Sequence, residues 1–464
     1  MSNAFAQLTT YAKIDKLKSF QSEAILSLFV GVDTLCLFPT GAGKTLSFTG
    51  VPVLYDILFN GPFEVGRERK VNFRPFALII SPLVNLMEEH VRKFRTLFPF
   101  LKATHVSSLQ SDDSIPDRVR RGEFDVVWMS PETILLDIWL NAFSSGDFPD
   151  RLFGVFYDEV HCVPKWGHEF RPDYLLLGIV RARLPLNVPI GGFTATLTPK
   201  ARIEVVQSLG MLNHATYELS VNRPNIFLAR YPYTSAEDGR FFLLQPLIKG
   251  LNKRGAGYPR TLIYCRTKEL ARSLAMALAD AVGEHGGLVN WFHAGICDEE
   301  RLRLAADFAS GDSKTRVLFA SIALGMGQDL ADLHMVWAID APEDLDDWMQ
   351  MLGRGGRDGK TSVAKLFFDS SNMGKVTPAM REFCTGDKCM RVLLAKHFNP
   401  TTDPQEFRNL YTEQKLDDAA IARLCCTVCA TRGSTFDPVH RLYDPRDAMK
   451  YFVASMEKGN TSIN

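Results

Sequence analysis

Short apolar runs alternate with longer amphipathic stretches along most of the chain. In the first half these runs are brief, rich in β-forming residues and bounded by Pro, Gly or polar residues, which is typical of buried strands. They lie at 76–83, 125–131, 152–160 and 189–196. The stretches at 82–97 and 199–211 have helical spacing. This alternation predicts an open parallel sheet with helices on both faces.

The pattern breaks at residues 222–240, where prolines and polar residues gather, and we interpret this segment as a crossing between two domains. Strand-like and helical stretches then resume. Strands are predicted at 260–267, 288–294, 316–321, 334–340 and 362–369, and helices at 268–282 and 298–310. Beyond about residue 376 only helical patterns remain, and these lie around 378–398, 414–425 and 445–457. The sequence predicts two tandem α/β domains, 1–221 and 222–375, and a small, mostly helical, cysteine-containing module at 376–464.

Composition narrows the function classes only a little. The 464 residues are 46% hydrophobic and 23% charged, with a formal net charge of zero. Nucleic-acid binding would therefore have to come from local grooves rather than from overall basic charge. No apolar run reaches the roughly 18 residues of a membrane span, and residues 1–20 lack the apolar core of a secretory signal. We expect no membrane partner.

The segment "LCLFPTGAGKTLSF" at 35–48 combines a strand, a glycine-containing turn and a helix start. Backbone N–H groups in such a turn, together with the positive end of the helix, bind phosphate. Lys44 would reach the β- and γ-phosphates of ATP, and Thr45 would ligate Mg²⁺. The full pattern has Gly where this chain has Phe38, and the alternative is a chance glycine turn. The predicted nucleotide-binding residues are Pro39, Thr40, Gly41, Ala42, Gly43, Lys44 and Thr45.

Two acids end the apolar run 152–160. A phosphate loop requires an acid at the end of a neighbouring parallel strand, and this run supplies it. Asp158 would hold Mg²⁺, and Glu159 would polarise the water that attacks the γ-phosphate. The alternative is a solvated strand end without chemistry.

Two arginines lie among glycines in "DLDDWMQMLGRGGRDGK" at 344–360. Glycines allow close approach of the backbone, and Arg354 and Arg357 could neutralise charge that develops on a γ-phosphate. An ordinary basic loop is the alternative. Because the phosphate loop belongs to the first predicted domain and these arginines to the second, ATP would draw the domains together and hydrolysis would release them.

Taken together, these motifs resemble those of superfamily 2 helicases, specifically the RecQ-type DNA helicases. The resemblance covers about residues 17–430 and rests on the order and spacing of many segments. These include "LKSFQSEAI", "FPTGAGKT", "SPLVNLMEEHV", "YDEVHC", "WGHEFRPDY", "GFTATLT", "NRPNI", "FHAGI", "GMGQD" and "QMLGRGGRDG". The resemblance implies two RecA-like phosphate-loop domains, and 3′-to-5′ translocation on single-stranded DNA with duplex unwinding, in DNA repair, recombination or replication.

The resemblance also implies residue roles. Gln21 would recognise the adenine edge, and Asp329 would approach the ribose. Gln350, Arg354 and Arg357 would close over the γ-phosphate. The residues that would link the nucleotide site to DNA are His161, Thr194 and Thr196. The chain's partners would be single-stranded and partially duplex DNA. We expect a monomer that works in the nucleus or, in a prokaryote, in the cytoplasm.

The segment after the acid pair is rich in aromatic and charged side chains. Trp166 and Phe170 could stack on bases, and His168 and Arg171 would move with them. We therefore predict that this segment couples DNA contact to hydrolysis. The alternative is that the aromatics are core residues, as Tyr174 could be.

Five of the nine cysteines lie between Cys384 and Cys429, which suggests a metal rather than disulfides. The resemblance implies a zinc module with one helix cysteine followed by C-x-x-C-x-x-C, a pattern that this chain matches only in part. Our predicted zinc ligands are Cys384, Cys389, Cys426 and Cys429. Cys425 is the alternative to Cys384 or Cys426, since adjacent cysteines would bind together only with strain. A module without metal is the other alternative.

Residues 430–464 leave no room for the winged-helix domain that often follows in this family, so we expect a short-form helicase with a weak hold on duplex DNA, or a partial gene product. Three rival functions are a non-hydrolysing regulatory DNA-binding protein, an RNA helicase of a related branch and an unrelated phosphate-loop NTPase. Intact Lys44, Glu159 and Arg357 argue against the first. The segment 162–174 argues against the second by resemblance, and the second α/β domain argues against the third.

Overall fold

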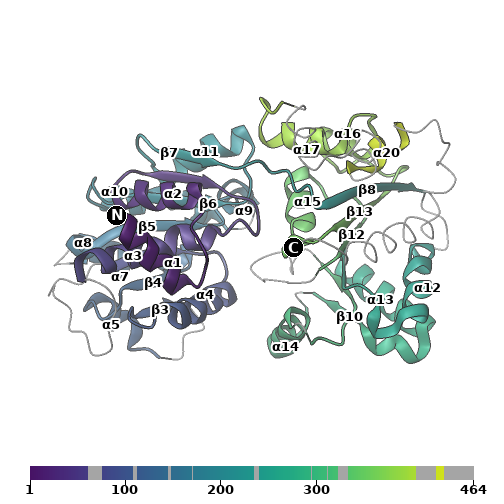
Figure 1. Ribbon diagram of the computed structural model, residues 1–464, viewed down its shortest axis with the longest axis horizontal. Coiled ribbons are helices and arrows are strands. Elements are labelled where there is room, and N and C mark those ends of the chain that lie inside the picture. The colour runs from purple at the N-terminus through teal and green to yellow at the C-terminus, as the bar shows by residue number, and fades with distance from the viewer. Residues whose placement is uncertain are drawn as a thin grey trace. The chain divides into compact units, whose positions relative to one another are not determined.

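The chain forms two compact units, Met1–Val221 and Asn222–Asn464, each of which is described by itself (Figure 1). The computed structural model describes residues 1–60, 76–107, 112–144, 148–169, 171–234, 240–293, 295–310, 312–321, 333–403 and 425–432.

The first unit is built on a seven-stranded sheet in which every pairing is parallel. Its strands, in spatial order, are β3 (Ala103–Val106), β4 (Val126–Met129), β2 (Phe76–Ile80), β5 (Leu152–Asp158), β6 (Ile190–Thr194), β1 (Thr34–Leu37) and β7 (Ala215–Glu218). The two strands that the apolar pattern did not predict, β3 and β7, lie at the edges. Edge strands bury less surface, so short, partly polar sequences suffice there.

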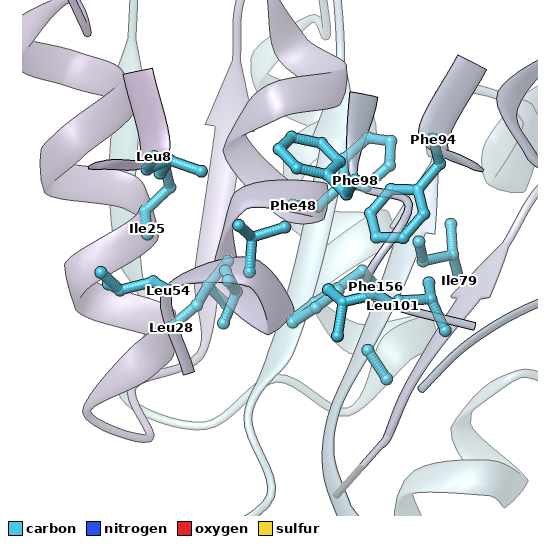
Figure 2. Close-up of a cluster of buried hydrophobic side chains, with 14 of the residues drawn as sticks. Leu8, Ile25, Leu28, Phe48, Leu54, Ile79, Phe94, Phe98, Leu101 and Phe156 are labelled. Carbon is cyan, nitrogen blue, oxygen red and sulfur yellow. The ribbon is translucent and has the colours of Figure 1, made fainter. Parts of the chain in front are cut away.

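Helices follow the strands of this unit. They are α1 (Ser2–Ala12), α2 (Ser19–Phe29), α3 (Lys44–Asn60), α4 (Val84–Leu97), α5 (Ile115–Arg120), α6 (Pro131–Ile134), α7 (Asp137–Ala142), α8 (Phe148–Arg151), α9 (Cys162–Glu169), the 3₁₀ helix η1 (Pro172–Leu176), α10 (Gly178–Arg183) and α11 (Pro199–Leu209). Helices α1 and α2 pack against α3. Their apolar side chains join those of α4 and the sheet in one buried cluster (Figure 2).

That cluster fixes the helix that follows the phosphate loop. Leu8, Ile25 and Phe48, from α1, α2 and α3, are each fully buried, as is Phe156 of β5 (Figure 2). Burying side chains of this size contributes about 1.5–3 kcal/mol each. The N-terminus of α3 is thereby held at the carboxyl end of β1, where ligands of parallel α/β sheets bind.

The second unit contains a six-stranded sheet, again parallel throughout. Its strands are β10 (Val289–Phe292), β11 (Val317–Ala320), β9 (Thr261–Cys265), β12 (Met335–Ile339), β13 (Ser362–Asp369) and β8 (Ile226–Tyr233). Its helices are η2 (Phe241–Leu244), α12 (Gln245–Arg254), η3 (Gly255–Gly257), α13 (Lys268–Val282), η4 (Gly283–Leu288), α14 (Asp298–Ala309), α15 (Leu345–Leu352), α16 (Pro378–Thr385), α17 (Met390–Phe398) and α20 (Thr427–Arg432).

Strand β8 lies inside 222–240, the segment that the sequence pattern marked only as a crossing. It is the last strand of its sheet, and an edge strand tolerates a proline such as Pro232. The helical pattern at 378–398 is divided into α16 and α17, whereas the patterns at 414–425 and 445–457 fall outside the described residues, apart from Cys425. Within the described part of the chain, no helix has both the length and the apolar character needed to cross a bilayer.

Candidate active site

The loop between β1 and α3 has the backbone geometry of a phosphate-binding turn. Gly41 and Gly43 adopt φ angles of 85° and 93°, in the left-handed region that favours glycine. A Cβ on Gly43 would lie 2.5 Å from Gln21 Nε2, so any larger residue would displace this side chain. Thr45, in the first turn of α3, is exposed.

Gln21 is tied to this loop from the first turn of α2. Its side chain is buried, and its Nε2 donates to the carbonyl oxygens of Gly43 at 3.1 Å and Ala42 at 3.4 Å. Lys18 adds a bond from its Nζ to the Ala42 oxygen at 3.2 Å. The residue that the resemblance assigns to adenine therefore contacts the predicted phosphate loop directly.

Lys44 and the acid pair meet at the carboxyl end of the sheet. Lys44 Nζ lies 3.2 Å from Glu159 Oε2, and the Glu159 N–H donates to Asp158 Oδ1 at 3.0 Å. Asp158 is only 7% exposed, which argues against a solvated strand end. Glu159 has a φ of 53°, and a non-glycine residue in this region costs about 1–3 kcal/mol.

The two carboxyl groups differ electrostatically. Burial, followed by the adjacent Glu159 carboxylate, raises the pKa of Asp158 to about 7. Burial would also raise the pKa of Glu159, but the Lys44 ammonium and His161 outweigh it and hold that pKa well below its usual range. Near pH 7, Asp158 is thus close to its pKa and can gain or lose a proton, whereas Glu159 is ionised.

His161 connects the acid pair to the end of β6. Its Nδ1 lies 3.3 Å from Glu159 Oε2 and 2.9 Å from Thr194 Oγ1. Thr194 Oγ1 in turn donates to the carbonyl oxygen of Thr196 at 3.4 Å. Burial opposes protonation of His161, but Cys162 and Glu159 raise its pKa to about 10. The structure thus brings together all three residues assigned to coupling by resemblance.

The aromatic segment 162–174 is packed rather than open. Trp166 is 7% exposed, and its ring meets that of Tyr174 edge-on at 5.8 Å. The Arg171 guanidinium lies over both rings, donates to the Pro82 carbonyl oxygen at 2.8 Å and pairs with Glu132. A base could stack on Trp166 only after this packing rearranges.

His168 and Phe170 are the other two residues of this segment that we predicted to couple DNA contact to hydrolysis. His168 is 62% exposed, and its Nε2 lies 2.5 Å from Glu204 Oε1. Phe170 lies outside the described residues, as does Asp329, the predicted ribose contact.

In the second unit, the arginine loop follows α15, which carries the half-buried Gln350. Arg354 is 8% exposed and Arg357 is half-buried. Burial raises the pKa of Tyr264 on β9, and both guanidinium groups oppose this rise, so both lie near its hydroxyl. The two predicted arginines therefore act on the same tyrosine of the central strand β9.

Helix α20 packs beside β8 (Figure 1). Four cysteine sulfurs gather near the start of this helix. The Sγ atoms of Cys389, Cys425, Cys426 and Cys429 all lie within 4.8 Å of one another. Cys389 Sγ is 3.5 Å from that of Cys425 and 4.0 Å from that of Cys426. Four thiolates around one Zn²⁺ lie about 3.8 Å apart, so this arrangement fits zinc.

The group differs from our predicted zinc set, because Cys425 is present and Cys384 is not. Cys384 is buried in α16, outside the cluster. The adjacent Cys425 and Cys426 both take part because the chain passes here from a bridge with Leu228 into α20, so their side chains do not alternate as in a strand. A hydrogen bond with Cys425 lowers the pKa of Cys389, and hydrogen bonds with Cys389 raise the pKa of Cys425 and of Cys429.

Comparison with known proteins agrees with these motifs. Residues 18–204 match the family model of the DEAD/DEAH box helicases, and residues 243–359 match that of the helicase conserved C-terminal domain. The chain is 31% identical over 352 residues to the probable ATP-dependent DNA helicase RecS of Bacillus subtilis, which covers 75% of this chain and 63% of that protein. It is 27% identical over 408 residues to the ATP-dependent DNA helicase Q1 of Mus musculus, covering 83% and 58%. The chain belongs to the RecQ-type helicases.

Solved helicase structures share the fold of this RecQ-type chain at lower identity. Dbp5 of S. cerevisiae, bound to RNA and ADP BeF3, matches with a TM-score of 0.61 and 18% identity over 89% of this chain and 97% of that one. The helicase MrfA bound to DNA gives 0.63 and 15% over 80% and 51%. The predicted fold class is thereby confirmed. The RecQ-type chain spans about three-fifths of the length of the RecS and mouse Q1 proteins.

Proposed function

We propose that this chain is an ATP-dependent 3′-to-5′ DNA helicase that couples ATP hydrolysis to movement along single-stranded DNA and to duplex unwinding. The contact between Lys44 and Glu159 carries the proposal, because it joins the phosphate loop and the acid pair in one partly buried polar site. The RecS and Q1 relatives are named as DNA helicases. A role in DNA repair, recombination or replication follows from that activity.

The site residues suggest how hydrolysis proceeds. When Lys44 turns to the phosphates of ATP, it leaves Glu159, whose pKa then rises and whose carboxylate becomes a better acceptor for a proton of the attacking water. His161 keeps Glu159 oriented in the meantime. Asp158 and Thr45 offer the oxygen ligands that Mg²⁺ prefers, and Mg²⁺ would neutralise charge on the phosphates.

The remaining nucleotide contacts are proposed from position in the family motifs. Gln21 would exchange its loop contacts for the adenine edge, and Asp329 would approach the ribose. Gln350, Arg354 and Arg357 would act on the γ-phosphate, where arginines stabilise the charge of the transition state.

Magnesium binding should depend on pH through Asp158. With a pKa of about 7, Asp158 is protonated below that pH and must lose its proton before it can bind the ion. We expect the Mg²⁺ affinity to fall by up to about tenfold per pH unit below about pH 7 and to level off above about pH 8. Calorimetric titration of the nucleotide-free protein across this range, with Asp158→Asn as the control that should lose the pH dependence, measures it. An affinity that stays constant over the range would contradict the assignment.

DNA coupling is proposed for Trp166, His168, Phe170 and Arg171, with His161, Thr194 and Thr196 as the link to Glu159. Arg171 ties this segment, which follows β5, to Pro82 and Glu132, which follow β2 and β4. A DNA strand that displaces the aromatic packing would therefore disturb the ends of all three β-strands.

Substituting Trp166 tests this coupling. Trp166→Ala should keep ATP binding and basal turnover but lose most of the stimulation by DNA, since the base-stacking surface is removed. Trp166 is buried, and the truncation also costs about 3–5 kcal/mol of stability. The comparison therefore includes Trp166→Phe, which keeps most of the packing and should keep part of the stimulation. Full stimulation of a folded Trp166→Ala protein would rule out the role.

Two measurements test the function as a whole. The first is ATPase activity with and without single-stranded DNA, and the second is unwinding of duplexes tailed at either end. We expect stimulation by DNA and unwinding only from the 3′ tail. Stimulation by RNA alone would favour the RNA helicase alternative, and DNA binding without turnover would favour the regulatory protein.

We further propose that Cys389, Cys425, Cys426 and Cys429 hold one Zn²⁺, and that the protein works as a monomer where cellular DNA is found, in the nucleus or, in a bacterium, in the cytoplasm. The fit of the four sulfurs to tetrahedral geometry supports the zinc site.

A further inference from the structure

Three segments that are far apart in the sequence meet at the start of β8. They are the first turn of α17, residues 222–226, and the glycines of the arginine loop. The helix residue is Arg391, which is 4% exposed. It stands two positions after Cys389, at the N-terminal end of α17.

Arg391 fixes residues 222–226 through three acceptors. Its Nη1 donates to Asn222 Oδ1 and to the Arg223 carbonyl oxygen, each at 2.9 Å. Its Nη2 donates to the carbonyl oxygen of Ile226. A guanidinium offers several donors in a rigid fork, so it can hold this stretch of backbone in one conformation.

Residues 222–226 in turn hold the arginine loop. Arg223 Nη2 donates to the carbonyl oxygens of Gly355 at 3.1 Å and Gly356 at 2.8 Å. Asn225 Nδ2 donates to the Gly356 oxygen at 2.8 Å. These two glycines are the residues between Arg354 and Arg357, so their carbonyl positions set the backbone from which both arginines project.

The backbone at Gly356 lies so close to Asn225 that neither residue has much room to move. Gly356 has a φ of 56°, and a Cβ there would lie 2.5 Å from Asn225 Nδ2. The Gly356 N–H also donates to the Leu333 carbonyl oxygen at 2.9 Å. Small shifts of residues 222–226 therefore pass directly to the arginine loop.

Helix stability alone does not account for Arg391. A cation in the first turn of a helix faces the positive end of the helix dipole, which is unfavourable by about 0.3–1 kcal/mol. The contacts with residues 222–226 offset the free-energy cost of burying this charge. The same residues hold the arginine loop through their own hydrogen bonds.

We infer that Arg391 is a positioning residue for Arg354 and Arg357, acting through Arg223 and Asn225. The inference rests on the proposed ATP hydrolysis. It makes the cysteine module part of the hydrolytic apparatus, because the start of α17 at Cys389 determines where Arg391 lies. Substituting Arg391 should slow the chemical step and leave ATP binding in the first unit nearly unchanged.

The test compares Arg391→Met with Arg230→Met in the full chain. Arg230 holds the same module, since its guanidinium donates to the carbonyl oxygens of Phe383 and Gly386 at the end of α16. With DNA present, Arg391→Met should lower kcat about tenfold and change KM for ATP by less than about twofold. Arg230→Met should keep kcat within about twofold of wild type.

Two further variants test the series of hydrogen bonds that runs from Arg391 through residues 222–226 to the arginine loop. Arg391→Lys keeps the charge but reaches fewer of the three acceptors, so its kcat should lie between those of Arg391→Met and wild type. Arg223→Met should reproduce the Arg391→Met defect. The double variant should be no slower than either single one, because both remove the same link. Zinc content and Tm are measured for every variant. If Arg391→Met fails to fold, Arg391→Lys takes its place in the comparison.

The outcomes separate the inference from the function on which it rests. A folded Arg391→Met protein with wild-type kcat overturns the inference. So does an equal loss in Arg230→Met, which would assign the effect to attachment of the module, and so do multiplying losses in the double variant. A wild-type protein without any ATPase activity would instead refute the proposed function.

Discussion

Glu159→Gln should lower DNA-stimulated ATP turnover by about 10²- to 10³-fold while ATP still binds. The amide keeps the shape of the side chain but cannot accept a proton from water. Its contact with Lys44, 3.2 Å in the wild type, loses one of its charges. Single-turnover hydrolysis together with binding of a fluorescent ATP analogue measures the two effects separately.

The matched control for this substitution is Glu218→Gln. Glu218 also pairs with a basic residue, Arg202, and its side chain is 25% exposed, against 24% for Glu159. It lies on the edge strand β7, and its substitution should change turnover by less than about twofold. Lys44→Ala should abolish turnover by losing ATP binding instead. Near-normal rates in either Glu159→Gln or Lys44→Ala would show that the site has been assigned wrongly.

Removing one thiol of the cysteine group should release the metal and destabilise the second unit. Purified protein is expected to carry about one zinc per chain, and Cys425→Ala to carry almost none, because zinc needs four ligands in its structural sites. Structural zinc contributes several kcal/mol to folding, so Tm should fall by about 10 °C or more. Elemental analysis and thermal unfolding measure the two effects.

Cys384→Ala is the control that decides between the two candidate ligand sets. Cys384 is buried on α16 but lies outside the four-sulfur group. Its substitution should keep the zinc and lower Tm only by the loss of a small buried group. Zinc lost with Cys384→Ala but kept with Cys425→Ala would restore the set expected from the sequence, and wild-type protein without zinc would remove the site.

Apolar periodicity predicted the central strands and the edge strand β10, but it missed the edge strands β3, β7 and β8. A strand buried on both faces, such as β2 or β12, must be a continuous apolar run, so its sequence identifies it. The edge strands β3 and β7 are short and partly polar, and β8 contains a proline, so their sequences resemble loops. Their pairing is decided by contacts with β4, β1 and β13, which no local pattern records.

The site was predictable where chemistry requires particular residue types at fixed positions along the chain. The phosphate loop and the acid pair are of this kind, and the structure brings Lys44 and Glu159 together. The network of Arg391 was not predictable, because its partners are mainly backbone carbonyl oxygens, which any sequence offers. The one available signal was an arginine two residues after Cys389, a cysteine of the predicted zinc set. The choice between Cys384 and its alternative Cys425 could not be made from the sequence for a similar reason, since the direction of adjacent side chains depends on the local backbone.

The cysteine segment also protects the second sheet. Strand β8 is an edge, and an uncovered edge strand exposes N–H and C=O groups that can pair with another chain. Cys426 forms a bridge with Leu228 on that edge, and the Arg230 N–H donates to Thr427 Oγ1 at 3.4 Å. The cysteines proposed to bind zinc thus belong to a segment that occupies part of the surface on which a second copy could add a strand. Loss of the metal would therefore favour aggregation through β8, a hazard to the cell that is separate from the loss of activity.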